Sequence, residues 1–196
     1  MAPELHLTGD AAADALLSSD PLALVIGMLL DQQVPMETAF AGPAKIAARM
    51  GDAGSIDAAA IASSDPEAFV QLFRATPAVH RFPGSMAARV QTLCRAIVDD
   101  WGGDAAAIWS SGNPTGAEVL ARLKKLPGFG DQKAKIFLAL LGKQYGLDAP
   151  GWREASAPLG EPGTLHSVAD IVDADSLARV RESKKAHRAA MKAARG

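Results

Sequence analysis

The chain has few aromatic residues and a single cysteine, and each scarcity excludes a class of protein. Aromatics make up 5% of its 196 residues, whereas hydrophobic residues make up 48%. A composition rich in alanine and poor in aromatics favours closely packed helices over sheets. Cys94 alone cannot form a disulfide within the chain or ligate an iron–sulfur cluster. We therefore expect Cys94 to be a small core residue.

Long apolar runs and a secretory leader are also missing. The longest apolar run, residues 22–30, is too short to span a bilayer, and the N-terminus has no basic stretch leading into an apolar one. We therefore expect a cytoplasmic protein that does not contact a membrane. Its length is enough for one large domain or two small lobes.

The chain as a whole carries little excess charge, but one segment of it is strongly basic. The formal net charge is −2, yet residues 179–196 contain seven Lys/Arg and one acidic residue. Where charges lie matters more than their sum for binding a polyanion. The basic tail either contacts backbone phosphates or is a solvated helix end, and the sequence leaves both interpretations open.

Hydrophobic periodicity predicts helices along the chain and no strand of useful length. The first begins at Asp20-Pro21, Ser85 is expected to cap a long one, and residues 146–163, rich in proline and glycine, are expected to be irregular. The sequence therefore predicts an all-α fold. The expected helices cover residues 22–33, 37–50, 56–62, 66–73, 85–101, 105–109, 116–125, 131–145, 167–172 and 175–196.

The most informative motif is the short turn Leu126-Pro127-Gly128-Phe129-Gly130 between two predicted helices. Its glycines supply the positive φ of a tight reversal, and the next helix begins with unpaired N–H groups at its positive end. That combination binds anions, most often phosphate. Neighbouring lysines favour a polyanion, so we predict a DNA-backbone clamp with Lys133 facing phosphate. An ordinary helix–helix connection in a protein-interaction module is the alternative.

Four segments, in this order, resemble the helix-hairpin-helix–GPD superfamily of DNA glycosylases, which includes endonuclease III, MutY and AlkA. The resemblance covers roughly residues 20–153 and implies a two-lobed helical fold. Residues 1–30 and 142–196 would form the terminal lobe, and residues 31–141 the helical lobe with the hairpin at about 116–145. The segments are Leu29-Leu30-Asp31-Gln32-Gln33-Val34, His80-Arg81-Phe82-Pro83-Gly84, the hairpin turn, and Gly146-Leu147-Asp148 followed by Arg153.

A glycosylase flips its target nucleotide out of the duplex, and other side chains fill the gap. The resemblance assigns this role to Gln33, less surely Gln32, and to Arg81 and Phe82, which hydrogen-bond, wedge or stack. The alternatives are that the glutamines end a helix and that Phe82 packs on the core. The other expected DNA-binding residues are Leu126, Gly128, Phe129, Gly130, Lys133 and Arg153, and Arg153 could instead hold its loop.

Asp148 is the catalytic candidate that the resemblance implies. Breaking the N-glycosidic bond develops positive charge on the sugar, which a carboxylate stabilises while it activates water. The alternative is an ordinary turn aspartate. Gln132 stands where strand-cleaving members have a nucleophilic lysine, and an amide cannot form a Schiff base. We therefore predict a monofunctional glycosylase, whereas a one-residue shift toward Lys133 would reverse that conclusion.

The resemblance implies no required cofactor, no iron–sulfur cluster and no metal, except a possible monovalent cation at the hairpin. The expected partner is double-stranded DNA, bound by a monomer. A non-catalytic DNA-binding protein is the main alternative, because only 18 positions separate Gly130 from Asp148. No short motif in the sequence indicates which base the protein would remove. Candidates for lining its pocket are Phe40, Trp109, Tyr145 and Trp152.

Overall fold

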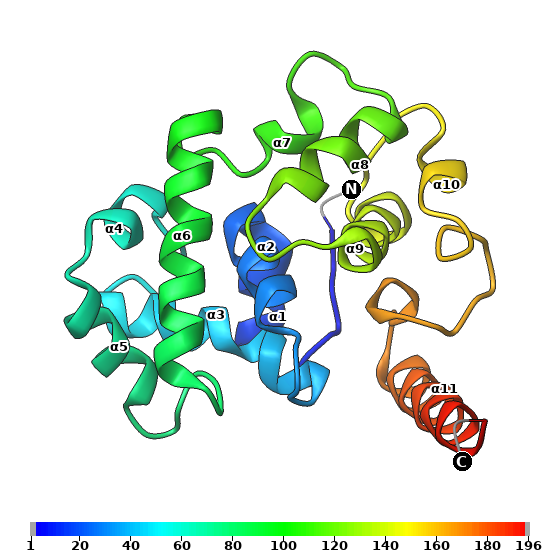
Figure 1. Ribbon diagram of the computed structural model, residues 1–196, viewed down its shortest axis with the longest axis horizontal. Coiled ribbons are helices and arrows are strands. Elements are labelled where there is room, and N and C mark those ends of the chain that lie inside the picture. Colours follow the sequence, from blue (N-terminus) through cyan, green and yellow to red (C-terminus); the bar gives the residue numbers. More distant parts are fainter. Residues whose placement is uncertain (1–2, 195–196) are drawn as a thin grey trace.

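The computed structural model describes residues 3–194, and within them the chain is helical with no strand (Figure 1). The predicted all-α class is confirmed. The helices are α1 (Ala11–Ser19), α2 (Pro21–Leu30), α3 (Met36–Met50), α4 (Ala58–Ser63), α5 (Pro66–Arg74), α6 (Pro83–Trp101), α7 (Ala107–Ser110), α8 (Gly116–Lys125), α9 (Asp131–Gln144), α10 (Trp152–Ala155), the 3-10 turn η1 (Val168–Asp170) and α11 (Ala174–Ala193).

One apolar core joins helices from both halves of the chain. At one side of the molecule α6 packs against α4 and α5, and at the other α9 packs against α8 and η1 (Figure 1). Helix α2 contacts both α3 and α6, and its residues 22–30 are all buried. Cys94 is fully buried as expected, and burial raises the pKa of its thiol to about 12. The division at residues 30 and 141 stays a prediction.

Helix α2 begins where the sequence predicts and ends earlier. The Asp20 carboxylate accepts hydrogen bonds from the backbone N–H groups of Leu22 and Ala23 at 2.8 and 3.1 Å, and Pro21 occupies the first turn. The expected extension to Gln33 is wrong, because the backbone leaves helical geometry at Asp31, where ψ is 70°, and Gln33 then adopts a left-handed φ of 58°. No single described helix is long and apolar enough to cross a membrane, although α1 and α2 pass that test together as a pair bent by 116°.

Helix α6 begins two residues before its predicted cap. Pro83 occupies the first turn, where its fixed φ suits a helix and its missing N–H is not needed. Phe82 is the N-cap residue, and the Ser85 hydroxyl donates to the Phe82 carbonyl at 3.4 Å instead of capping the helix. The predicted cap at Ser85 is therefore wrong, and this start places Phe82 at the end of an exposed loop.

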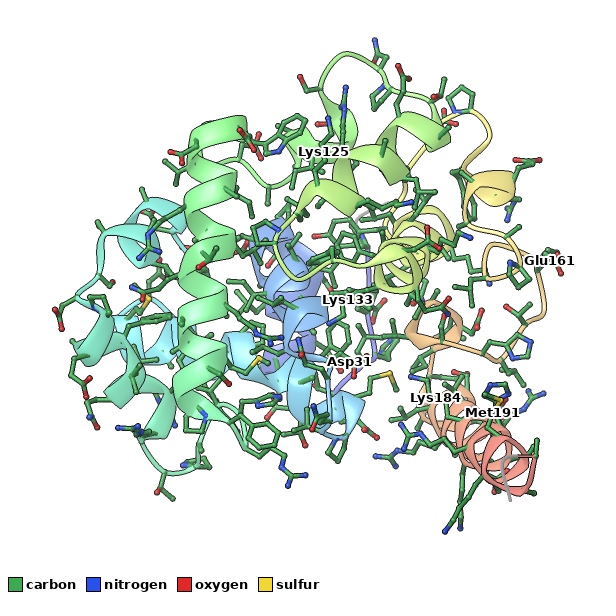
Figure 2. All side chains as sticks on the ribbon, in the orientation of Figure 1. Asp31, Lys125, Lys133, Glu161, Lys184 and Met191 are labelled. Carbon is green, nitrogen blue, oxygen red and sulfur yellow. The ribbon has the colours of Figure 1, made fainter. Side chains whose placement is uncertain are left out.

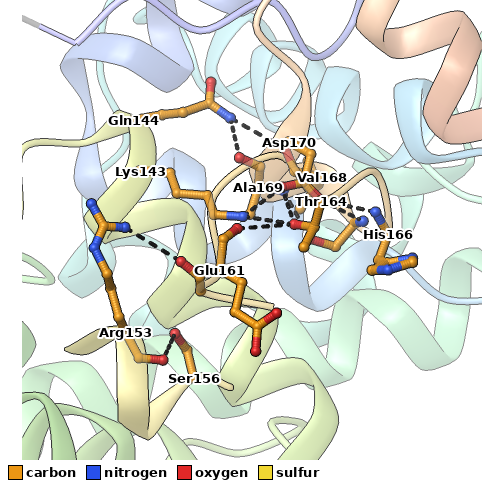
Figure 3. Close-up of polar contacts among 12 residues, drawn as sticks. Lys143, Gln144, Arg153, Ser156, Glu161, Thr164, His166, Val168, Ala169 and Asp170 are labelled. Atoms are coloured by element: carbon orange, nitrogen blue, oxygen red, sulfur yellow. Dashed lines mark hydrogen bonds and ion pairs between the residues drawn. The ribbon is translucent and has the colours of Figure 1, made fainter. Parts of the chain in front are cut away.

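The irregular segment after α9 is fixed by a polar network around Asp170 (Figure 3). The Asp170 carboxylate accepts from the Lys143 ammonium at 2.6 Å and from the Thr164 hydroxyl at 2.8 Å. It also accepts from the backbone N–H groups of His166 and Ser167 at 2.9 and 3.1 Å. The network holds η1 against α9, and η1 leads directly into α11.

Replacing Asp170 by alanine should strongly destabilise the protein. The change leaves a Lys143 side chain that is only 13% exposed without its carboxylate, and losing one partner of a buried ion pair costs about 3–5 kcal/mol. Urea unfolding at pH 7 measures the loss. Asp175→Ala is the control, because Asp175 is exposed in the first turn of α11 and its charge there contributes less than about 1 kcal/mol. Equal losses in the two variants would contradict this account.

Candidate nucleic-acid interface

The turn between α8 and α9 depends on one of its two glycines. The Phe129 N–H donates to the Leu126 carbonyl at 3.0 Å and closes the turn. Gly128 has a φ of 84°, and a Cβ there would lie 2.3 Å from a methyl carbon of Leu29. Gly130 has a φ of −77° and open space beside it. The expected need for positive φ therefore holds for Gly128 and is wrong for Gly130.

The apolar side chains of the turn face the core. Leu126 and Phe129 are both buried, and the Phe129 ring packs edge-on against Phe137 with centroids 5.8 Å apart. Their side chains shape the turn and are not presented to a ligand. Since no side chain caps α9, the groups available to an anion are the backbone N–H groups at its start.

Asp131 reduces the positive charge around this turn. Its carboxylate pairs with the ammonium groups of Lys124 at 2.9 Å and Lys135 at 3.4 Å. The hydrogen bonds from these two lysines hold the pKa of the Asp131 carboxyl below its usual value. Two of the lysines next to the turn, Lys124 and Lys135, are therefore already paired, while Lys125 is exposed.

Lys133 turns inward and connects α9 to the end of α2. Its ammonium donates to the Leu29 carbonyl at 3.0 Å, and the same oxygen accepts from the Gln32 side-chain amide at 2.9 Å. Burial lowers the pKa of Lys133, and the nearby Asp31 charge opposes that shift. The expectation that Lys133 faces a phosphate outside the turn is wrong. Figure 2 shows Lys133 and Asp31 near the centre of the molecule.

The two glutamines after α2 differ in their surroundings. The Gln32 side chain is fixed, because its oxygen accepts from the Arg89 guanidinium at 2.8 Å while its nitrogen donates to Leu29. Gln33 is exposed beyond the end of the helix. The structure therefore puts Gln33 where a duplex could reach it. Its contact with DNA stays a prediction.

His80 joins the glutamine segment to the Arg81-Phe82 loop, and the sequence did not mark it as a functional residue. Its ring is 1% exposed; Nε2 lies 3.1 Å from the Gln32 carbonyl, and Nδ1 accepts from the Phe82 N–H at 3.1 Å. This pattern corresponds to a neutral ring protonated at Nε2. The Phe82 side chain is 40% exposed with the Arg81 guanidinium 4.8 Å above its ring, so the interpretation that it packs on the core is wrong.

A groove of about 420 Å³ lies between α6 and the hairpin turn. It is lined by Ala88, Arg89, Thr92, Pro127 and Gly128.

None of the aromatic side chains expected to line a base pocket contributes to this groove. Phe40 is fully buried, and Trp109 is buried against Phe137 and Tyr145. Trp152 packs closely over Gly142 of α9. Phe40, Trp109, Tyr145 and Trp152 therefore pack within the core and against α9.

Asp148 lies at the opposite end of the hairpin from the turn. The preceding Leu147 N–H donates to Leu141 in α9 at 3.1 Å, and the Gly116 N–H at the start of α8 donates to the Pro150 carbonyl at 2.8 Å. Helix α9 has 14 residues and is therefore about 21 Å long. The structure does not bring the exposed Asp148 together with Gln33 or with the first turn of α9. Its catalytic role stays a prediction.

Gln132 and Arg153 also occupy opposite ends of α9. Gln132 is exposed in the first turn of the helix. The Arg153 guanidinium lies 4.3 Å above the Trp152 ring and donates to the Gly160 carbonyl at 3.4 Å, which agrees with the interpretation that it holds its own loop. Residues 3–194 contain no group of three or more His, Cys, Asp or Glu that could hold a metal ion. A monovalent cation at the turn stays a prediction.

Alanine at position 128 should be far more damaging than alanine at position 130. Gly128→Ala introduces a positive-φ alanine and a clash with Leu29, so we expect it to lower the free energy of unfolding by about 1–3 kcal/mol and to weaken duplex binding. Gly130→Ala is the matched control and should cost less than about 1 kcal/mol, because its backbone is extended and its surroundings are open. Urea unfolding and fluorescence anisotropy with a DNA duplex measure both effects. Equal behaviour of the two variants would contradict the assigned geometry.

The His80 contacts should make stability depend on pH. Burial lowers the pKa of His80 below its ordinary value of 6.5, so the unfolded chain takes up a proton more readily than the folded one. The contribution of neutral His80 is present above pH 6.5 and is lost as the pH falls from there through the lowered pKa. Between pH 7 and pH 5 the wild type should therefore lose more of its free energy of unfolding than His80→Gln, which does not titrate. Parallel losses would show that His80 has no such role.

One comparison with known proteins identifies the family of this chain. A family profile described as HhH-GPD superfamily base excision DNA repair protein matches residues 26–195. No significant match to a curated protein was found. The matched range includes the end of α2, the His80 loop, the hairpin and all of α11. The chain therefore belongs to the HhH-GPD superfamily of base excision DNA repair proteins.

Proposed function

We propose that this protein is a monofunctional DNA N-glycosylase, which hydrolyses the bond between a flipped, damaged or mismatched base and its sugar. The observation that carries the proposal is the grouping of three elements, each predicted to contact DNA, around one set of contacts. The Gln33 turn, the Arg81-Phe82 loop and the hairpin turn are joined through His80, Gln32 and Lys133. An enzyme that removes a base needs such a group, because it must grip the backbone and fill the vacated stack together.

The hairpin supports backbone binding through its main chain. The N–H groups at the start of α9 have no side-chain cap, and the positive end of the helix dipole lies with them. Exposed Lys125 adds positive charge near the turn. A duplex bound in this way by one monomer leaves Gln33 and Phe82 to contact the bases.

The absence of strand cleavage rests on Gln132, whose amide cannot attack the sugar to form an imine. A strand-cleaving glycosylase is the second candidate, and one observation favours it. The Lys133 amine is partly buried beside the end of α2, and burial lowers its pKa, which increases the share of the nucleophilic neutral form. The two candidates differ in whether the product strand is broken before alkali treatment.

A panel of duplexes with alkylated, oxidised, deaminated or mismatched bases tests the proposal. We expect base release from at least one duplex, strand breaks only after alkali, and no covalent complex after borohydride reduction. A trapped complex that disappears in Lys133→Met and persists in Lys135→Met would establish the strand-cleaving candidate instead. Lys135 is a suitable control because it pairs with Asp131 at the surface of the same helix.

Two further results would change the assignment. Tight, salt-sensitive duplex binding without base release from any substrate would favour the non-catalytic DNA-binding alternative. Asp148→Asn tests the carboxylate that the sequence assigned to catalysis. A folded Asp148→Asn variant with wild-type base release would remove Asp148 from the reaction.

A further inference from the structure

Asp31 is a carboxylate beside the joined interface and directly follows α2. It lies two residues before exposed Gln33 and two residues after Leu29, whose carbonyl accepts from Lys133. The positive charges of three basic side chains, Lys133 from α9 and Lys184 and Arg188 from α11, act on its carboxyl and oppose the rise of its pKa. Figure 2 shows Asp31 and Lys133 near the centre of the molecule and Lys184 on the neighbouring α11.

Two of these basic side chains contact groups other than the Asp31 carboxylate. Lys133 donates to the Leu29 carbonyl, and the Lys184 ammonium lies 4.0 Å from the Met36 sulfur. Among residues 3–194, no side chain within ion-pair distance neutralises the Asp31 carboxylate. Its oxygens are therefore available to another group.

The position of Asp31 is unfavourable for the fold itself. Burial raises the pKa of its carboxyl, although the three neighbouring positive charges oppose the shift. The residue also caps the C-terminal end of α2, where the helix dipole disfavours negative charge. A desolvated carboxylate at the negative end of a helix, with no direct partner, has the character of a functional residue and not of a structural one.

The charge arrangement matches a nucleotide undergoing loss of its base. In the transition state the sugar develops positive charge, while the phosphates on either side stay negative. A single carboxylate among three basic side chains offers an opposite charge to each of these groups. We infer that Asp31 is the catalytic carboxylate that faces the sugar of the flipped nucleotide, while Lys184 and Arg188 contact its flanking phosphates.

The inferred step is hydrolysis, and it rests on the proposed glycosylase function. The C1′–N bond breaks with its electron pair passing to the base, and a water oxygen forms a new bond to C1′. The Asp31 carboxylate accepts one proton from that water and returns it to solvent. The departing base takes up one proton, so a nucleotide and water give a free base and an abasic site.

Base release by Asp31→Asn under single-turnover conditions tests the inference. We expect a loss of about 100-fold or more, the usual contribution of a positioned acid–base group. Because the ionised carboxylate destabilises the fold above its unfolded pKa, Asp31→Asn should be at least as stable as the wild type in urea. Asp100→Asn is the matched control, since it removes an exposed carboxylate from the C-terminal turn of α6 and should leave base release unchanged.

The pH dependence provides a readout that a purely structural role would not change. The wild-type rate of base release should fall as the pH drops through the raised pKa of Asp31, which the charges of Lys133, Lys184 and Arg188 oppose. The residual rate of Asp31→Asn should show no such fall on the acid side. Wild-type base release in Asp31→Asn, or a loss confined to Asp148→Asn, would overturn the inference alone. Absence of base release by the wild type on every lesion would remove both the inference and the proposed function.

Discussion

The carbonyl oxygen of Leu29 is the acceptor around which the interface is assembled. It accepts from Lys133 at the start of α9 and from Gln32 beyond the end of α2, so two segments about a hundred residues apart share one contact. A helix end normally leaves such carbonyls unpaired, and a donor from another helix therefore fixes both elements. The close approach of Gly128 to Leu29 brings the hairpin turn to the same place.

The remaining contacts extend from this point in two directions. Through Gln32 and His80 the contacts reach the loop that exposes Phe82. On the other side, the paired Lys143 and Asp170 hold η1 against α9, and α11 follows with its basic side chains near Asp31. The Lys143–Asp170 pair therefore holds the segment from which α11 and its basic side chains continue.

Local patterns in the sequence predicted the fold well because local interactions determine its helices. Asp20 and Pro21 start α2 as capping rules require, and the turn glycine at 128 marks the hairpin. The same capping rules misplaced two helix ends. Pro83 begins α6 before the expected cap at Ser85, and α2 ends early at Leu30, where Asp31 leaves helical geometry.

The candidate site was predicted only in part, because its contacts join residues distant in sequence. Exposure of Gln33 and Phe82 agrees with the roles the resemblance gave them. His80 escaped notice since its partner Gln32 is 48 residues away. The spacing of Asp131 and Lys135 already allowed an ion pair, whereas nothing in the periodicity showed that Lys133 would reach inward to Leu29.

The central claim is that base removal occurs at the end of α2, beside the hairpin turn, and not at the loop after α9. A crystal structure of the protein bound to a duplex with a stable abasic-site analogue tests it most directly. The account predicts that the extrahelical sugar lies against the Asp31 carboxylate, with the hairpin amides on a nearby phosphate. A sugar seated beside Asp148, at the far end of α9, would contradict it.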